Sequence, residues 1–376
     1  MAEILTLCAV GDIFYDREDP KSMFAKSAAV FAQADINFLQ LDQVLSLHAQ
    51  PASNARSPLR GHPRLARTLK EVGFDIASFA SNHCLDFRVE GLIDTINCVR
   101  EQGITIIGVG QDLDEARKPA IIDKKGTRVA FLAYNSILPS GYEARIGKPG
   151  CAPIRVWTSY QPYEGFQPGT PCRILTHAQE DDLEAMKEDI RKVRPLADVV
   201  IVSMHWGLHH VPAMLAMYQR EVGHAAIDSG ADLILGHHPH ILKPIEVYKG
   251  KVIFYSLGNF CTELSHENMD KWSSTNPEMK ASREIYELLD DPAFPCHPDA
   301  RKSMIAKISI ANKKISKVSY LPVMINKNNE PEVLGSQDPG FGAIVDYMRS
   351  IDKSQKIMTE YTVSGAEVLI RAPIIS

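Results

Sequence analysis

Short apolar segments of strand length alternate with longer segments of helical periodicity through most of the chain. The predicted strands are Ile4–Val10, Ile36–Leu41, Ile76–Ala80, Thr105–Gly108, Val129–Ala133, Val199–Met204, Leu233–Leu235 and Val252–Ser256. The predicted helices include Pro63–Val72, Arg88–Gln102, Glu180–Val193 and Ala213–Ser229. Later, Met304–Ile310 and Ile315–Val323 flank a polar turn and predict a hairpin. The alternation predicts an α/β fold with helices covering a sheet, rather than a helical bundle or an all-β sandwich.

The charge balance limits the partners that the chain can have. Lys and Arg total 41 and Asp and Glu total 46, so the net charge is −5. A protein that coats nucleic acid or an anionic membrane carries an excess of basic residues, which this chain lacks. We therefore expect no nucleic-acid partner, and an anionic substrate would have to be attracted by local charges.

The cysteines and the N-terminus bear on the cellular compartment. Seven cysteines are scattered along the chain without a Cys-x-x-Cys pair, which favours reduced structural thiols over a zinc knuckle or a redox switch. The apolar N-terminus lacks a basic flank and reaches Gly11 and Asp12 too soon for a signal peptide. No apolar run approaches membrane-spanning length. We expect a cytoplasmic protein without a membrane anchor.

The domain organisation follows from length and from two irregular stretches. The 376 residues could form two average domains, but α/β folds often use this length in one core. We expect one domain over residues 1–330, with insertions near residues 141–171 and 261–298, and a C-terminal extension, residues 331–376, packed on it. The first insertion is rich in Gly, Pro and aromatic residues, and loops of that length are often lids or binding segments.

Metal-capable side chains follow the predicted strands at their C-terminal ends. They are Asp12, Asp42, Asn82, His205, His238 and His240. In open α/β sheets, functional sites are assembled outside the carboxyl ends of the strands. A set of carboxylate, amide and imidazole ligands suits Mn, Fe, Zn or Mg, and it lacks the thiolates of a structural zinc site. The sequence therefore predicts a site for one or two divalent ions.

Each of these residues also has an ordinary structural explanation. Asp12 could cap a helix or form a turn, and a single buried His205 is more often a hydrogen-bonded core residue. Asn82 and the following His83 form a common turn sequence. The pair His238 and His240 is stronger, because alternate side chains of an extended segment point to the same side. It is the occurrence of all of them at successive strand ends that favours a metal site.

The order of these motifs and their residues resemble those of the CapA family of capsular poly-γ-glutamate synthesis proteins, within the calcineurin-like metallophosphoesterase superfamily. The resemblance covers Leu5 to Val323. Its most specific stretches are Ser81-Asn82-His83-Cys84-Leu85-Asp86, Gly236-His237-His238-Pro239-His240 and Tyr255-Ser256-Leu257-Gly258-Asn259-Phe260. It implies that residues 1–330 form a CapA-like metallophosphoesterase domain, an α/β fold with a four-layer αββα sandwich of the metallo-dependent phosphatase type.

The resemblance also implies a role for each site residue. Asp12 and His240 would bind one metal, Asp42 would bridge, and the second metal would take Asn82, His205 and His238. His83 would stabilise the oxyanion or protonate the leaving oxygen, and Asp86 would orient it. Two metals about 3.5–4 Å apart can hold a hydroxide at neutral pH and screen charge on a phosphoryl oxygen. The activity implied is hydrolysis of a phosphoester.

Three positions depart from the pattern that the resemblance implies. The superfamily has a histidine two residues after the first aspartate, where this chain has Phe14. CapA-like proteins usually have a glutamate at the position of Asp42 and an acid at the position of His209. His209 or His210 could supply nitrogen instead of oxygen, whereas His62 is better explained by helix entry. We expect one metal to bind tightly and the other weakly or not at all.

Three functions remain open from the sequence. The first is a metal-dependent hydrolase acting on an anionic small molecule or polymer. The second is an enzyme or accessory protein acting on a γ-glutamyl or peptide-like polymer. The third uses the same fold without a metal, either for acid/base chemistry with Asp12, His83 and His209 or for peptide binding beneath residues 141–171.

Overall fold

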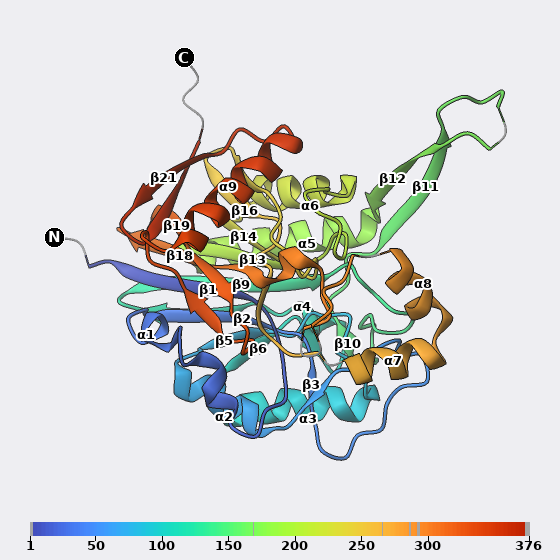
Figure 1. Cartoon of the computed structure of the whole chain (residues 1–376). Helices are drawn as coiled ribbons and strands as arrows, with labels where there is room; N and C mark the ends of the chain where they lie inside the picture. Colours follow the sequence, from blue (N-terminus) through green and yellow to red (C-terminus); the bar gives the residue numbers. More distant parts are fainter. Residues whose placement is uncertain (1–2, 168, 265, 286, 292–293, 373–376) are drawn as a thin grey trace.

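Two β-sheets pack face to face in the computed structural model, which describes residues 3–372 except 168, 265, 286 and 292–293 (Figure 1). One sheet has the order β21 (Glu360–Ser364), β22 (Glu367–Arg371), β19 (Lys314–Ile325), β18 (Lys302–Ala311), β1 (Leu5–Phe14), β2 (Ile36–Leu41), β5 (Ile76–Ser78) and β6 (Thr105–Ile107), with β17 (Asn259–Thr262) beside β1 and β20 (Pro331–Val333) beside β19. The other has the order β15 (Ile245–Tyr248), β16 (Lys251–Phe254), β14 (Leu233–His237), β13 (Val199–His205), β9 (Thr127–Asn135) and β8 (Ala120–Lys124).

The central core lies between the two sheets. Successive residues of β1 alternate, so that Leu7 and Ala9 face the other sheet while Cys8 and Val10 face the outer helices. Phe38 of the first sheet stacks on Phe131 of the second, with ring centroids 6.0 Å apart. This double-sided burial explains why the strands appear in the sequence as nearly continuous apolar runs.

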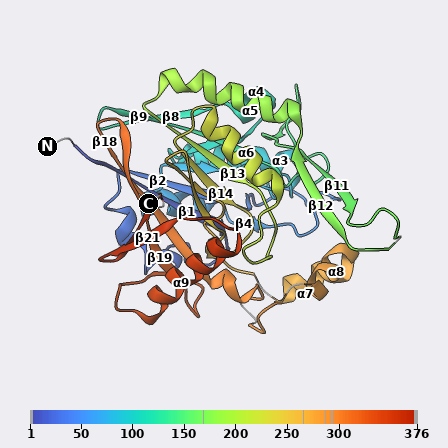
Figure 2. The same ribbon diagram turned by 90° about the horizontal axis from the view of Figure 1, so that it is seen from above.

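Helices cover the outer face of each sheet (Figure 1), and the view from above shows the helices that lie over the upper sheet (Figure 2). On the first sheet, α2 (Arg64–Val72) and α3 (Arg88–Glu101) bury an apolar stripe that packs against strand residues such as Leu39. On the second sheet, α5 (Glu180–Val193) and α6 (Met217–Asp228) do the same against residues such as Val202. Helix, sheet, sheet and helix thus form four layers, which confirms the predicted αββα sandwich. In the described part of the chain, no helix is both long and apolar enough to cross a bilayer.

Most predicted elements are present, with one informative difference in where a helix begins. The hairpin of β18 and β19 turns through Asn312 and Lys313, whose φ angles of 51° and 64° match the twist of a tight hairpin turn. Helix α6 begins at Met217 rather than at the predicted Ala213. The φ of Ala213 is 57°, a left-handed conformation that cannot belong to an α-helix.

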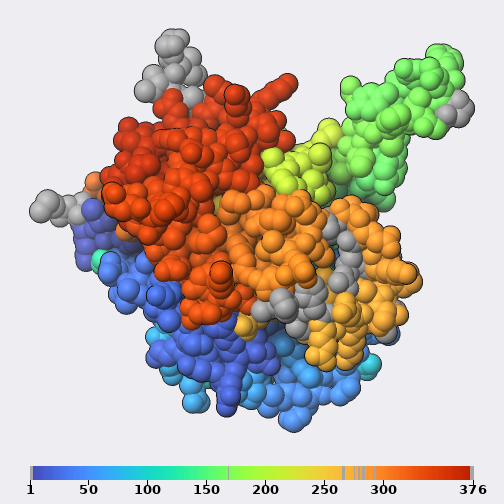
Figure 3. Space-filling model, in the orientation of Figure 1, coloured from blue at the N-terminus to red at the C-terminus, as the bar shows by residue number. Residues whose placement is uncertain are grey.

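The two insertions contain secondary structure that the sequence pattern does not reveal. Part of the first is a hairpin of β11 (Val156–Pro162) and β12 (Cys172–Ala178), which projects from the body of the molecule (Figure 1, Figure 3). Its side chains are mostly exposed on both faces, so no alternation of apolar and polar residues marks it. The second insertion forms α7 (His266–Thr275) and α8 (Pro277–Ile285).

The C-terminal segment adds to the first sheet and to the central core. Strands β20, β21 and β22 pair within that sheet, and α9 (Pro339–Ser354) packs its apolar side into the core. Residues 373–376 lie outside the described part of the chain, as do Met1 and Ala2. The end of α9 is held by Asp352, which accepts hydrogen bonds from the Tyr361 hydroxyl at 2.6 Å and the Ile245 amide at 3.1 Å.

Asp352 makes the stability of the fold depend on pH. Burial raises its pKa from 3.8 to about 7. Between these two values the unfolded chain has released the proton that the folded chain retains. The contribution of Asp352 to stability is therefore fully present below about pH 4, and it is lost as the pH rises towards 7. The slope is about 1.4 kcal/mol per pH unit. In Asp352→Asn the amide oxygen can still accept from the Ile245 amide and the NH2 group can donate to the Tyr361 hydroxyl, so this variant should lose about 2 kcal/mol less than the wild type between about pH 4.5 and pH 6.5. Urea unfolding at each pH measures this, and parallel stability curves for the two proteins would contradict it.

Candidate metal centre

The six predicted ligands lie together where the carboxyl ends of strands from both sheets meet. Asp12 and Asp42 come from β1 and the end of β2, and Asn82 follows β5 in the first sheet. His205 ends β13, and His238 follows β14 in the second sheet. The Oδ1 atom of Asn82 lies 2.7 Å from Nε2 of His205 and 3.2 Å from Nδ1 of His238, so the amide joins the two sheets.

Asp12 is placed by a close approach between two backbone segments. A Cβ atom on Gly11 would lie 1.9 Å from the carbonyl oxygen of Gly258, so only glycine fits there. The Asp12 amide donates to that same oxygen at 3.1 Å. Its buried carboxylate accepts a hydrogen bond on Oδ2 from the His238 amide at 3.1 Å, whereas Oδ1 has no hydrogen-bond partner among the described residues.

Asp42 is a second buried carboxylate with a free oxygen. Its amide donates to the Ile13 carbonyl at 2.9 Å, and its Oδ1 accepts from the Ser81 hydroxyl. Its Oδ2 has no hydrogen-bond partner in the described part of the chain. Burial raises the pKa of Asp12 well above its ordinary value, and the nearby Asp42 charge adds to the rise. Two buried carboxylates with unsatisfied oxygens are costly unless a cation joins them.

The histidines are in the form that binds metals. Burial lowers the pKa of His205 and His238 well below the ordinary value, and it also lowers the pKa of His240, so all three rings are neutral near pH 7. Nδ1 of His240 lies 2.8 Å from Oδ1 of Asn259. Because that amide oxygen can only accept, Nδ1 carries the proton, and the lone pair is on Nε2, 3.7 Å from Oδ2 of Asp42.

The segment His238-Pro239-His240 is a strained turn, not the extended segment that the sequence suggests. The φ angles of His238 and His240 are 91° and 56°, both in the left-handed region. Non-glycine residues rarely adopt this conformation, and such strain is typical of functional sites. The two rings still face the same space, with centroids 5.9 Å apart.

The spacing of the donors is slightly wider than around a bound ion. The imidazole nitrogens that carry the lone pairs lie 3.7 Å (Nε2 of His240 to Asp42) and 4.0 Å (Nδ1 of His205 to Asp12) from carboxylate oxygens. Two ligands of one ion at about 2.1 Å are about 3.0–3.4 Å apart. In the described part of the chain, no three His, Cys, Asp or Glu side chains are already arranged to hold an ion. Burial, charge and donor chemistry nevertheless fit a divalent cation, which would draw these side chains together.

His83 and Asp86 form a buried pair beside the carboxylates. Nδ1 of His83 lies 2.6 Å from Oδ2 of Asp86, which is itself held by the Leu59 amide at 2.8 Å and, through Oδ1, by the Tyr142 hydroxyl at 3.0 Å. Burial lowers the pKa of His83, but the charges of Asp86 and Asp42 outweigh burial and raise it overall. Among the described histidines of this cluster, His83 is thus the one whose pKa is raised rather than lowered.

Four other positions that the sequence leaves open also have clear surroundings. Phe14 packs edge-on against His240, with centroids 5.5 Å apart, beside the candidate ligands. The rings of His209 and His210 lie 4.0 Å apart, and His209 lies 5.1 Å from His240. His62 accepts a hydrogen bond from the Arg64 amide at 3.0 Å at the start of α2, as expected for helix entry.

Two residues to which the sequence pattern gives no role, Asn259 and His237, lie against the candidate ligands. Asn259 orients His240. The sequence does not indicate this role, because Asn259 lies in a motif without a charged group. His237 is fully buried, stacks on Phe38 with centroids 5.9 Å apart, and has its pKa lowered to about 3 by burial. Its Nδ1 lies 4.0 Å from Oδ1 of Asp12. Its position next to His238 in the sequence was the available signal.

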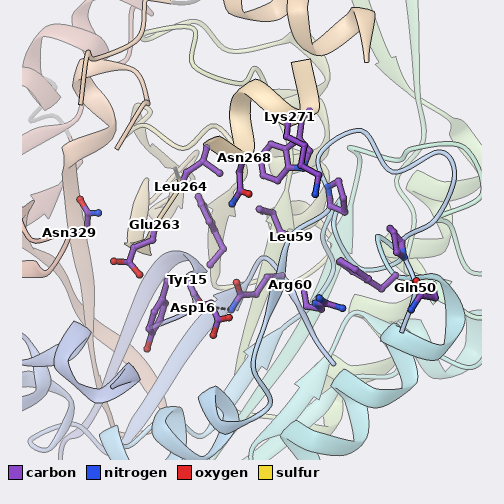
Figure 4. A pocket seen from close by; sticks show the side chains of 16 residues that line it. Tyr15, Asp16, Gln50, Leu59, Arg60, Glu263, Leu264, Asn268, Lys271 and Asn329 are labelled. Carbon is purple, nitrogen blue, oxygen red and sulfur yellow. Dashed lines mark hydrogen bonds between the residues drawn. The ribbon is translucent and has the colours of Figure 1, made fainter. Parts of the chain in front are cut away.

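A cavity of 340 Å³ opens onto the cluster, lined by Asn82, His83, His238 and His240 among others. Met269 and Trp272 of α7 form part of its wall, so the covering segment is the second insertion. No residue of the first insertion, as far as it is described, lines this cavity. A larger groove of 710 Å³ runs alongside and shares Phe14 and Trp272 with it (Figure 4).

The position of Phe14 generates a test of metal stoichiometry. We expect protein purified without added metal to hold one divalent ion per chain, because the first metal lacks an imidazole. Phe14→His should supply that ligand beside His240 and raise the content towards two ions, whereas the control Phe14→Leu should not. Elemental analysis of the three proteins measures this. Two tightly held ions in the wild type would contradict the expectation.

Comparison with solved structures shows similarity to the calcineurin-like phosphoesterase YfkN from Bacillus subtilis. The sequence identity is 13%, the TM-score is 0.44, and the match covers 94% of this chain and 98% of that chain.

Comparison with sequences shows clearer relatives. The PGA biosynthesis protein CapA of Bacillus subtilis is 30% identical over 268 residues, which cover 69% of this chain and 63% of that protein. A protein of Mycobacterium tuberculosis, described as a probable polyglutamine synthesis accessory protein, is 28% identical over 263 residues, which cover 69% of this chain and 62% of that protein. The match thus spans less than two-thirds of either relative. The profile of the bacterial capsule synthesis protein PGA_cap matches residues 6–263, and the chain therefore belongs to the PGA_cap family of bacterial capsule synthesis proteins.

Proposed function

We propose that the chain is a metal-dependent hydrolase that cleaves a phosphoester in the cleft above Asp12 and Asp42. The observation that carries the proposal is the pair of buried carboxylates, each with an unpartnered oxygen, beside neutral imidazoles and one raised-pKa histidine. A structural cluster would satisfy its own polar atoms. This one leaves two carboxylate oxygens without a partner in the described structure, beside Asn82, His238 and His240, which line the cavity.

The proposed ligands are Asp12, Asp42, Asn82, His205, His238 and His240. A divalent ion held there supplies a hydroxide at neutral pH and screens negative charge on a phosphoryl oxygen. Asn259 and the His238 amide hold His240 and Asp12 in place for this role. Burial of the two aspartates and the three histidines keeps bulk water away and strengthens these interactions.

His83 is the proposed acid. Its Nδ1 is tied to Asp86, so the proton available to a substrate is on Nε2. A protonated ring can donate a hydrogen bond to a phosphoryl oxygen or transfer the proton to the leaving oxygen. Asp86 and its two further hydrogen bonds fix the orientation of the ring.

A second candidate function is action on a γ-glutamyl or peptide-like polymer, as an enzyme or as an accessory protein. It is supported by the names of the relatives and by the groove beside the cleft. Amide side chains suited to peptide-like groups line that groove, among them Gln43, Gln50 and Asn268. Metal-independent acid/base chemistry is the third candidate, and activity that survives exhaustive chelation would favour it.

The His83–Asp86 pair gives the decisive variants. His83→Ala should lower kcat for p-nitrophenyl phosphate by about 10²–10⁴-fold, because the proton donor is lost. Asp86→Asn should lower it by about 10–100-fold through misorientation of the ring. Metal content, measured in parallel, should stay unchanged in both.

The control is His48→Ala, which removes an exposed histidine far from these contacts and should retain full activity. Absence of turnover by the wild type on phosphomonoesters and phosphodiesters, with Mn, Fe, Zn and Mg each supplied, would refute the hydrolase proposal.

A further inference from the structure

Arg56 stands at the wall of the catalytic cleft, on the loop between β3 (Val44–Leu45) and β4 (Arg60–Gly61). It lines the same cavity as Asn82 and His83. We propose that Arg56 binds the terminal phosphoryl group of a small phosphomonoester whose alcohol portion is apolar. The inference rests on the proposed function and narrows its substrate class.

The guanidinium of Arg56 is not used to stabilise the fold. Among the residues that the structure describes, it makes no hydrogen bond and no carboxylate lies within ion-pair distance. The half-buried Arg117 and Arg194 are paired, with Asp189 at 2.7 Å and Asp232 at 2.5 Å, whereas Arg56 is exposed at the wall of the cavity. An arginine left with its five donors free at the wall of a cleft suits a planar, two-point contact with an oxyanion.

A count of charges shows why this residue matters. The carboxylates of Asp12 and Asp42 would neutralise one divalent cation, and His83 is paired with Asp86. The remaining ligands, Asn82 and the histidines, are neutral. Arg56 is thus the one net positive charge among the described residues that line this cavity, in a chain whose net charge is −5. Without it the cleft would not favour a doubly charged phosphoryl group.

Arg56 lines the same cavity as His83, His209 and His240, so its positive charge borders the space that a substrate would occupy.

The rest of the wall sets the size and character of the substrate. Apart from the candidate ligands and Arg56, the cavity is largely apolar, with Leu59, Leu208, Met269 and Trp272 on different sides. Its volume of 340 Å³ is at the small end for organic ligands. One small apolar group fits beside the phosphoryl group within this cavity, and no lysine and no second arginine is among the described residues that line it.

Direct binding of inorganic phosphate tests the role of Arg56 independently of turnover. Isothermal titration calorimetry with the full-length chain and Mn²⁺ compares the wild type with two variants. Arg56→Gln removes the positive charge, and Arg56→Lys keeps the charge but loses the two parallel N–H donors of the guanidinium. We expect Arg56→Gln to weaken phosphate binding by about 10–100-fold and Arg56→Lys by less. The matched control is Arg67→Gln, which removes an exposed arginine of α2 and should bind phosphate as the wild type does.

Kinetics provides the second measurement. For p-nitrophenyl phosphate, Arg56→Gln should raise KM by about 10–100-fold with a smaller change in kcat, and the singly charged bis-p-nitrophenyl phosphate should be affected less. Equal phosphate affinity in the wild type and Arg56→Gln, or no phosphate binding by the wild type, overturns the inference. Phosphate binding that depends on Arg56 supports it even when no ester is hydrolysed, a result that would overturn the proposed function alone.

Discussion

The burial of two carboxylates at the junction of two sheets is the constraint on which the rest of this structure depends. Asp12 and Asp42 are inaccessible to solvent, and each keeps one oxygen without a hydrogen-bond partner in the described structure. Such an arrangement persists only if surrounding groups offset its cost. Three features offset this cost: the lack of a side chain at Gly11, the hydrogen bond from the Ser81 hydroxyl and the hydrogen bond from the His238 amide. The strained turn around Pro239 places that amide. The layers of the fold supply the rigidity that this arrangement requires.

Much of the fold could be predicted because both faces of the sheets are buried. Continuous apolar runs such as Ile36–Leu41 mark the strands, and glycines such as Gly73, with a φ of 112°, mark where helices end. The hairpin of β11 and β12 could not be predicted, because a ribbon exposed on both faces has no reason to alternate apolar and polar side chains. The C-terminal strands β21 and β22 are short and carry charged residues, which hides them in the same way.

The candidate site was predictable to the extent that its residues follow strands. Asp12, Asp42 and His205 are placed by the strands to which they belong, so their convergence follows from topology alone. Arg56 lies on a loop without periodicity, and only the folded chain shows that it lines the same cavity as His83. The role of Asn259 depends equally on a contact between distant segments. Residues that act through tertiary contacts leave no local pattern in the sequence.

Helix α7 belongs to neither sheet, yet it walls the cleft that the sheets create. The groups that would perform chemistry and the groups that would choose the molecule are consequently carried by separate stretches of polypeptide. Substitutions in the loop that carries Arg56 and in the insertion that carries Trp272 can accumulate while the charged cluster stays unchanged. Members of one family can in this way diverge in what they recognise while inheriting the same reactive apparatus.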